Sequence, residues 1–224
     1  MSVARTKLVT LKRSLRLRTR LKEFRRWSVR YWGGGLIVHD WWLDRRFGGY
    51  CGGTIASPFA SQGATRTESC SYRTLGVLFG HPMLRIDPRD VLVDVGCGKG
   101  RVINFWLLRG RQNSIVGVEL TPSVAEWTRR RLSSFTNVRI VEGDASSRVP
   151  PDGTLFFLFN PFGRDTMQAF ALRVSQNAGP AGVRIVYLNA RHIDVFPVER
   201  WTITDIPTGS PDRAVLITAG PASS

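Results

Sequence analysis

The chain has 224 residues, of which 42% are hydrophobic and 22% charged, a composition typical of a globular protein with a substantial core. Its 32 Lys and Arg against 17 Asp and Glu give a formal net charge of +15, which favours nucleic acid, an anionic membrane surface or an acidic substrate as a partner. No apolar run approaches the ~20 residues of a membrane span, no secretory signal is expected, and three cysteines without metal-ligand spacing argue against a disulfide framework and a metal site.

Positive charge gathers in residues 1–32, which are predicted to form a basic helical arm. Between residues 5 and 30 there are eleven Lys or Arg and a single acid, Glu23. The interleaved leucines shift from one helical face to another, so the amphipathic pattern is only fair. Three interpretations remain open: contact with an anionic bilayer, contact with nucleic-acid phosphates, or a solvated tail. We expect a cytoplasmic protein, peripheral at the membrane if the first interpretation holds.

The next segments connect this arm to the rest of the chain. Gly33–Gly35 interrupts any helix before it. The residues expected on one buried helical face after it are Trp41, Trp42, Leu43 and Phe47. A second helix is predicted over residues 71–80, because Leu75 and Leu78 have helical spacing and Ser71 is suited to cap it.

Residues 91–101 hold the motif on which the functional prediction depends. An apolar run, Val91–Val95, is followed by Gly96, Gly98 and Gly100 and then by a helix-like segment. A strand, a tight glycine turn and a helix in this order offer a ligand the carboxyl end of a strand and the N-terminus of a helix. The spacing is G-x-G-x-G, which differs from the G-x-G-x-x-G of dinucleotide-binding loops.

Asp94, two residues before the first glycine, completes this pattern. With Asp94-Val-Gly-Cys-Gly-Lys-Gly, the sequence resembles the class I S-adenosylmethionine (SAM) methyltransferases, whose first motif has this form. The resemblance implies that the loop holds the methionine part of SAM, with Asp94 in its hydrogen-bond network. It also implies that Tyr72 lies near the SAM carboxylate or the substrate, although a buried structural tyrosine is an equal alternative.

Two more acids follow predicted strands and fit the same resemblance. Glu119 ends the strand 114–119 and matches the family acid that accepts the ribose hydroxyls of SAM. Asp144 follows the strand that begins at residue 137 and matches the acid that bonds the adenine amino group. Between them, Thr121-Pro122 is suited to start a helix. That helix is expected to turn Val124, Trp127 and Leu132 to the sheet and to keep Arg129, Arg130 and Arg131 in solvent.

The apolar run 154–159, typical of a central parallel strand, ends in Asn160-Pro-Phe-Gly163. This tetrapeptide is similar to the Asn-Pro-Pro-Tyr motif of enzymes that methylate amide or amino nitrogens. There the Asn side chain accepts hydrogen bonds from the target NH group, and the aromatic ring stacks on the target. Asn160 and Phe162 are therefore acceptor-site candidates, Asn160 also lying next to the cofactor; the alternative is that Asn160-Pro161 only turns the chain. His192, after the strand 183–188, is the best-placed general base.

The loop Gly-Cys-Gly-Lys-Gly-Arg101 and the Asn-Pro-Phe motif also resemble a group of small, mostly uncharacterised bacterial methyltransferases. The segment Leu43-Asp-Arg-Arg-Phe-Gly48 looks like one found ahead of the catalytic domain in that group. The group continues into a Thr and a Gly where this chain has Tyr50-Cys51-Gly52.

The predicted fold is α/β: a Rossmann-like class I methyltransferase fold, whose seven-stranded, mostly parallel sheet ends in a C-terminal antiparallel hairpin of residues 201–206 and 214–218. The expected organisation is an arm and connector over residues 1–55 and a SAM-dependent methyltransferase domain over 56–224. The predicted activity is methyl transfer from SAM to an unidentified acceptor, with nitrogen favoured. The alternatives are a SAM- or nucleotide-binding protein without catalysis, a nucleic-acid-binding factor on the same scaffold, and an NAD-dependent dehydrogenase, which the glycine spacing disfavours.

Overall fold

The structure is a computed structural model, and it describes residues 34–53, 69–180, 182–209 and 211–220. The chain divides after Trp42 into two compact units, and the fold given below is that of the larger one, residues 43–224. The predicted basic arm, residues 1–32, lies outside the described ranges. No helix within those ranges has the length and apolar character that a membrane crossing requires.

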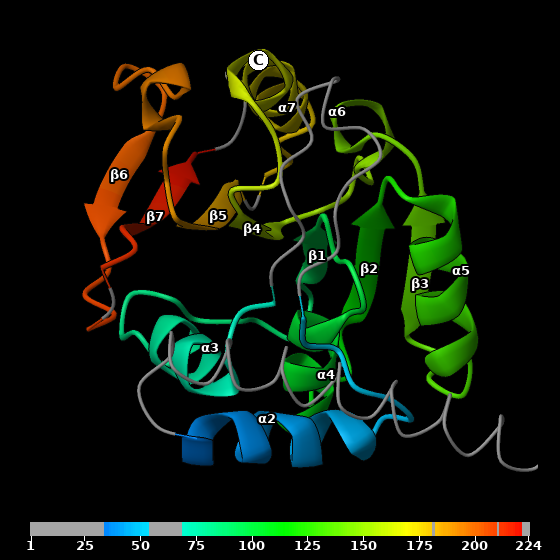
Figure 1. The fold of residues 1–224 in the computed structure, drawn as a ribbon. Coiled ribbons are helices and arrows are strands. Elements are labelled where there is room, and N and C mark those ends of the chain that lie inside the picture. Colours follow the sequence, from blue (N-terminus) through cyan, green and yellow to red (C-terminus); the bar gives the residue numbers. More distant parts are fainter. Residues whose placement is uncertain (1–33, 54–68, 181, 210, 221–224) are drawn as a thin grey trace, which may run out of the picture. The chain divides into compact units, whose positions relative to one another are not determined.

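A seven-stranded sheet forms the centre of this unit (Figure 1). Its strands are β1 (Val91–Val95), β2 (Ser114–Glu119), β3 (Val138–Glu142), β4 (Leu155–Phe159), β5 (Val183–Leu188), β6 (Thr202–Asp205) and β7 (Ala214–Ala219). They lie in the order β3-β2-β1-β4-β5-β7-β6, with β1 to β5 parallel and β7 antiparallel to both of its neighbours. The predicted sheet and its C-terminal antiparallel hairpin are therefore confirmed.

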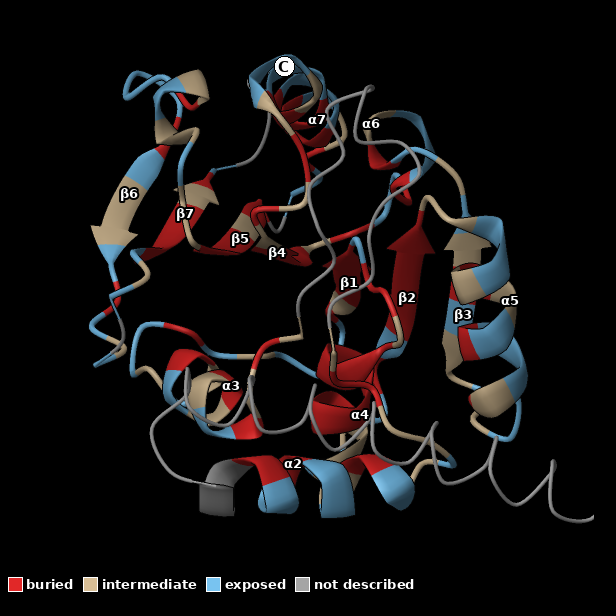
Figure 2. Cartoon of the chain, in the orientation of Figure 1, coloured by how far each residue is buried: buried red, intermediate tan, exposed pale blue. Residues whose placement is uncertain are grey.

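Helices cover both faces of the sheet, so that the central strands are buried (Figure 2). The helices within the described ranges are, in chain order, α2 (Gly34–Arg45), α3 (Tyr72–Phe79), α4 (Arg101–Leu108), α5 (Pro122–Arg131), α6 (Ala145–Arg148), α7 (Arg164–Gln176) and the 3₁₀ helix η2 (Ile193–Val195), and those from α3 onward belong wholly to the larger unit. Apolar residues of α3, α4 and α5 share one core layer with Leu92, whereas those of α6 and α7 share the other with Val93. Successive residues of β1 thus enter opposite layers, as the alternation of a strand requires.

The strand order reverses at β1, and this reversal positions the site. β1 connects to β2 on one side and pairs with β4 on the other. At such a switch point the loops after the two central strands diverge and leave a crevice at their carboxyl ends. The two loops here are residues 96–100 and residues 160–163. The fold therefore brings the two sequence motifs to one edge of the sheet.

The prediction for helix α5 is confirmed for Leu132, which is buried, and Val124 is partly buried. It is wrong for Trp127, which is 39% exposed, whereas Ala125 and Thr128 are buried. Ala125, Thr128 and Leu132 share one face of a helix with 3.6 residues per turn, and Trp127 lies outside it. There the indole packs against Arg131, whose guanidinium carbon is 5.1 Å from the ring centroid.

Three smaller expectations also differ from the structure. Trp41 and Trp42 are 39% and 56% exposed, so they do not form the predicted buried face of the connector helix. Thr121 occupies the N-cap position of α5, but its side chain makes no capping hydrogen bond. Arg131 is only partly exposed and donates to three groups, so the prediction that it lies in solvent is wrong.

Gly117 of β2 is expected to tolerate no side chain. A Cβ there would lie 2.8 Å from Cys97 Sγ and 2.9 Å from the Cδ1 atoms of Ile103 and Ile140. Gly117→Ala should therefore lower the free energy of unfolding by about 1–3 kcal/mol through overpacking, as measured by urea denaturation. The matched control is Gly179→Ala, where a Cβ would meet nothing within 4 Å, so the change should stay below about 0.5 kcal/mol. Equal stability of the two variants would contradict this account of the packing.

Candidate functional site

The loop after β1 adopts a conformation that requires glycine. Gly96, Gly98 and Gly100 have φ values of 72°, 51° and 76°, a region that side chains rarely allow. The amides of Gly96 and Cys97 both donate to the carbonyl oxygen of Val118 at 2.9 Å, which holds the loop against the tip of β2. A Cβ on Gly96 would lie 3.0 Å from the Cβ of Pro161, so the two motif loops are close neighbours.

A pocket opens beside this glycine loop, at the carboxyl end of β1. Its lining residues are Ser69, Cys70, Asp94, Val95, Gly96, Cys97, Gly98, Lys99, Arg101, Val102, Phe157 and Phe159. The lining combines apolar side chains such as Phe157 and Phe159 with residues of the glycine loop. It also includes two buried side chains of opposite charge, Asp94 and Arg101, which are 2% and 3% exposed. A ligand that carries both an apolar part and charged groups would match this lining.

Asp94 is the most unusual group in the pocket. Its Oδ2 atom is buried and has no hydrogen-bond partner within the described part of the chain. Burial raises the pKa of this carboxyl well above its usual value, and the nearby Glu119 raises it further. Buried polar groups are nearly always paired in native proteins, so an orphaned carboxylate oxygen in a pocket indicates a site for a donor or a cation.

Glu119 lies at the tip of β2, as predicted, and it is 4% exposed. Its Oε2 accepts the amide of Gly98 and its Oε1 accepts the amide of Thr121, both at 2.9 Å. Each carboxylate oxygen can accept more than one hydrogen bond, so this carboxylate retains capacity for ligand hydroxyls. The structure thus brings Glu119, Asp94 and the glycine loop together.

Asp144, the third predicted acid, is exposed just beyond β3. Its Oδ1 accepts the amide of Ser146 at 2.8 Å and thereby caps the short helix α6. The amide of the preceding Gly143 donates to the carbonyl oxygen of Glu119 at 2.9 Å, so the tips of β3 and β2 are adjacent. The contact of Asp144 with an adenine group stays a prediction.

Asn160 and His192 are brought together by a residue that the sequence did not single out. Asn160 is 8% exposed and has a φ of 41°, which is uncommon for a residue other than glycine. The hydroxyl of Tyr187 donates to Asn160 Oδ1 at 3.3 Å and accepts the backbone amide of His192 at 3.4 Å. Tyr187 belongs to the apolar run of β5, where nothing in the pattern distinguishes it from a core residue.

Phe162 and Tyr72 are both buried, and their predicted roles at the site stay predictions. Phe162 is 7% exposed and packs against Phe170 of α7, with ring centroids 5.9 Å apart. This placement in the core gives no support to stacking on an acceptor. Tyr72 is also buried, and its hydroxyl donates to Asp44 Oδ1 at 2.9 Å, which corresponds to the structural alternative.

The comparisons with known proteins agree with this geometry. Residues 92–163 match a family model described as a methyltransferase domain. A probable cobalt-precorrin-6B C(15)-methyltransferase (decarboxylating) from Archaeoglobus fulgidus is 36% identical over 70 residues, which are 31% of this chain and 39% of that protein. The chain thus spans well under half the length of this curated relative.

Solved structures are similar in fold at low sequence identity. A putative methyltransferase from Escherichia coli has a TM-score of 0.54 and 18% identity, covering 70% of this chain and 92% of that one. An RNA methyltransferase from Salinibacter ruber, in complex with S-adenosyl-L-homocysteine, has a TM-score of 0.54 and 19% identity, covering 70% and 96%. The fold is therefore the Rossmann-like fold of class I methyltransferases, and the domain match supports a protein of this class.

Metal chemistry has no candidate site in the ranges that the structure describes. No group of three or more His, Cys, Asp or Glu side chains lies there in a position to hold a metal ion. The three cysteines, Cys51, Cys70 and Cys97, are buried and unbridged.

Asp94 is expected to destabilise the ligand-free protein as the pH rises. Because its pKa is raised in the folded state, the folded protein retains a proton that the unfolded chain releases above a pH of about 4. Stability therefore falls from that pH up to the folded-state pKa. Asp94→Asn should remove this dependence and raise the melting temperature at pH 7 by at least about 2 °C in scanning calorimetry.

Asp152→Asn, at an exposed position in the turn before β4, is the control and should leave the pH dependence unchanged. A lower melting temperature for Asp94→Asn than for the wild type at pH 7 would show that the Asp94 carboxylate has a stabilising partner. The Oδ2 atom of Asp94 would then not be an unpaired buried group in the ligand-free protein.

Proposed function

We propose that the protein is a SAM-dependent methyltransferase. The observation that carries this proposal is the orphaned, buried carboxylate oxygen of Asp94 in a pocket beside three positive-φ glycines and Glu119. A methionine ammonium and a sulfonium are cationic, and a ribose offers two hydroxyl donors, so the donor and acceptor groups of SAM suit these residues. The class I fold and the methyltransferase-domain match over residues 92–163 support the same proposal.

The proposed cofactor contacts follow the strand tips. Asp94 binds the cationic end of the cofactor, and Glu119 accepts hydrogen bonds from the ribose hydroxyls. Because Gly96, Gly98 and Gly100 carry no Cβ, the backbone of the loop can approach the cofactor closely. Asp144 is proposed to accept a hydrogen bond from the adenine amino group. Asn160 is proposed to lie between the methyl donor and the acceptor. Tyr72 is proposed to support the cofactor site indirectly, through its hydrogen bond to Asp44.

SAM supplies an electrophilic methyl group on a positively charged sulfur. The protein's own part is to align the acceptor with that methyl group and to keep water away, because an in-line displacement depends on alignment. Asn160 is proposed to orient the acceptor through its side-chain amide, which the hydroxyl of Tyr187 holds in place. His192 is proposed to remove a proton where the acceptor must lose one.

We propose nitrogen as the acceptor atom, on the similarity of Asn160-Pro-Phe to the motif of nitrogen methyltransferases. The buried position of Phe162 leaves Asn160 as the main support for this choice. An RNA methyltransferase is among the similar folds, but low identity transfers no substrate. A SAM-binding protein without catalysis is the second candidate, and turnover with a nitrogen acceptor distinguishes the two.

The domain organisation proposed from sequence is an arm and connector over 1–55 and a methyltransferase domain over 56–224. The arm suggests a binding partner in addition to the cofactor and the methyl acceptor. We propose that the arm binds an anionic membrane surface. Eleven Lys or Arg between residues 5 and 30 supply charge, and the exposed Trp41 and Trp42 of α2 are side chains suited to a lipid interface. Nucleic acid is the competing partner for the same charge.

Calorimetric titration tests the cofactor. The wild type is expected to bind SAM and S-adenosylhomocysteine with micromolar affinity, about −8 kcal/mol. Glu119→Ala should weaken binding at least about tenfold, because ribose hydroxyls lose a charged acceptor. Glu126→Ala, which removes an exposed carboxylate of α5, is the matched control and should bind as the wild type does. Binding of NAD in place of either ligand would refute the proposal.

Deletion of residues 1–32 tests the arm. The full chain is expected to sediment with phosphatidylserine-containing liposomes and not with phosphatidylcholine liposomes, and the shortened chain should lose this binding while retaining its affinity for S-adenosylhomocysteine. An RNA oligonucleotide is tested alongside. If the deletion abolishes RNA binding and leaves liposome binding unchanged, the arm binds nucleic acid and the membrane proposal is wrong. If the deletion changes neither, the arm is a solvated tail.

A further inference from the structure

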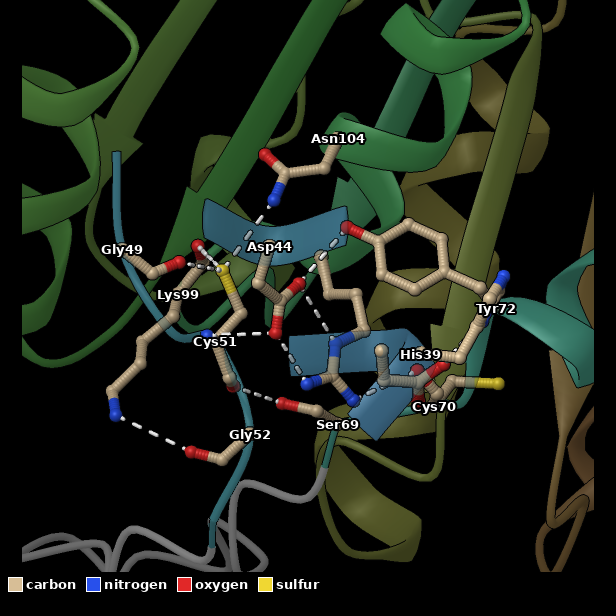
Figure 3. A network of polar contacts seen from close by, with 12 residues as sticks. His39, Asp44, Gly49, Cys51, Gly52, Ser69, Cys70, Tyr72, Lys99 and Asn104 are labelled. Atoms are coloured by element: carbon tan, nitrogen blue, oxygen red, sulfur yellow. Dashed lines mark hydrogen bonds and ion pairs between the residues drawn. The ribbon is translucent and has the colours of Figure 1, made fainter. Parts of the chain in front are cut away.

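A buried carboxylate outside the matched family region connects the two sides of the pocket. Asp44, next to the end of α2, is 0% exposed, and the described residues give it four hydrogen bonds (Figure 3). Its Oδ1 accepts the Tyr72 hydroxyl at 2.9 Å and Arg101 Nε at 3.2 Å. Its Oδ2 accepts Arg101 Nη2 at 2.6 Å and the amide of Cys51 at 3.0 Å.

Arg101 needs this carboxylate for two physical reasons. It is the first residue of α4, where the positive end of the helix dipole disfavours a cation. Its side chain is also almost completely buried, and a buried guanidinium without a counter-charge is strongly unfavourable. Asp44 offsets both effects, because its two oxygens accept hydrogen bonds from Arg101 Nε and Nη2. This bidentate ion pair is the geometry that carboxylates and guanidinium groups prefer.

From Asp44 the contacts continue into both walls of the pocket. On one side, Cys51 donates its thiol to the carbonyl oxygen of Lys99 in the glycine loop, at 3.3 Å. Burial and Asp44 raise the pKa of Cys51 to about 11, so the thiol retains the proton it donates at neutral pH. On the other side, the Ser69 hydroxyl donates to the Cys51 carbonyl oxygen at 2.5 Å, and Arg101 Nη1 donates to the Cys70 carbonyl oxygen at 3.4 Å.

The residues at which these contacts end are lining residues of the pocket. Ser69, Cys70, Lys99 and Arg101 all line it together with Asp94. Asp44 does not line it, so any effect of Asp44 on a ligand must pass through those residues. The segment 43–52 lies outside the region 92–163 that the methyltransferase-domain model matches.

We infer that Asp44 is a positioning residue for the proposed cofactor site, holding the glycine loop and the Ser69–Cys70 segment at the spacing that the ligand requires. The inference rests on the proposed function. A pocket that is ordered before binding saves the ligand the cost of ordering it, so the affinity for the cofactor should depend on Asp44.

The opposite edge of the sheet offers a matched control. Asp90 is 6% exposed and accepts the Thr154 hydroxyl at 2.8 Å and the Asp87 amide at 2.6 Å. It also pairs with Arg184. Asp90 precedes β1, whereas the pocket follows that strand, and neither member of this pair lines the pocket.

The experiment measures S-adenosylhomocysteine affinity by calorimetry and melting temperature by circular dichroism on the full chain. Asp44→Leu/Arg101→Met removes both buried charges, an exchange that is often neutral for stability. It should bind the ligand at least about tenfold more weakly, as expected for a lost preorganised contact. Asp90→Leu/Arg184→Met should retain wild-type affinity whatever its melting temperature. Asp44→Glu/Arg101→Lys, which keeps an ion pair, should recover most of the affinity.

Tyr72→Phe covers the case in which the charge-free variant does not fold, because it keeps the ion pair and removes the hydroxyl that donates to Asp44. It should weaken ligand binding about threefold and speed amide exchange of residues 96–100 in the ligand-free protein. Wild-type affinity in folded Asp44→Leu/Arg101→Met, wild-type affinity and exchange in Tyr72→Phe, or an equal loss in the Asp90 variant would overturn the inference and leave the proposed function standing. A wild type that does not bind S-adenosylhomocysteine would instead overturn the proposed function.

Discussion

Burial of both faces of the parallel strands is the constraint that places the chemistry of this protein. Leu92 and Val93 enter opposite apolar layers, and the same holds along β2, β4 and β5. Polar groups are tolerated there only where a strand ends or where a partner is provided, because an unpaired polar group within such a layer is costly. Asp94, Glu119 and Asn160 therefore gather at the carboxyl ends of β1, β2 and β4. The reversal of strand order between β1 and β4 leaves a pocket at this edge, which Asp94 lines, and Glu119 accepts the amide of the pocket residue Gly98.

The two edges of the sheet use buried charge in different ways. At the amino edge, Asp90 has a cationic partner, a hydroxyl donor and a backbone donor, so its role is complete within the fold. At the carboxyl edge, Asp44 is satisfied in the same manner, but its partner Arg101 lines the pocket. Asp94 differs from both, because one of its oxygens has no partner among the described residues. A fully paired carboxylate supports structure, whereas an orphaned one at a pocket points to a ligand.

The residues that misled sequence reasoning are those whose side chains combine apolar and polar parts. Helical periodicity selected Trp127 for the sheet side and passed over Thr128, yet Thr128 is buried, with its hydroxyl donating to the Gly98 carbonyl oxygen at 2.9 Å. Arg131 belongs to a run of three arginines, yet it donates to the Lys99 carbonyl oxygen at 2.6 Å, as part of the support beneath the glycine loop. In both cases the partner lies on another element, and no local pattern records it.

The sequence by itself determined the strands, the glycine loop and the acids at the strand tips. Those features follow from local requirements: continuous apolar runs for buried strands, glycine where φ is positive, and a polar residue where a strand leaves the core. Only the tertiary structure decided which charges are paired. Asp44 and Arg101 are 57 residues apart in the chain, and Tyr187 reaches Asn160 across 27. A buried charge needs a partner in space, and the chain's folding rather than its local pattern brings that partner into contact.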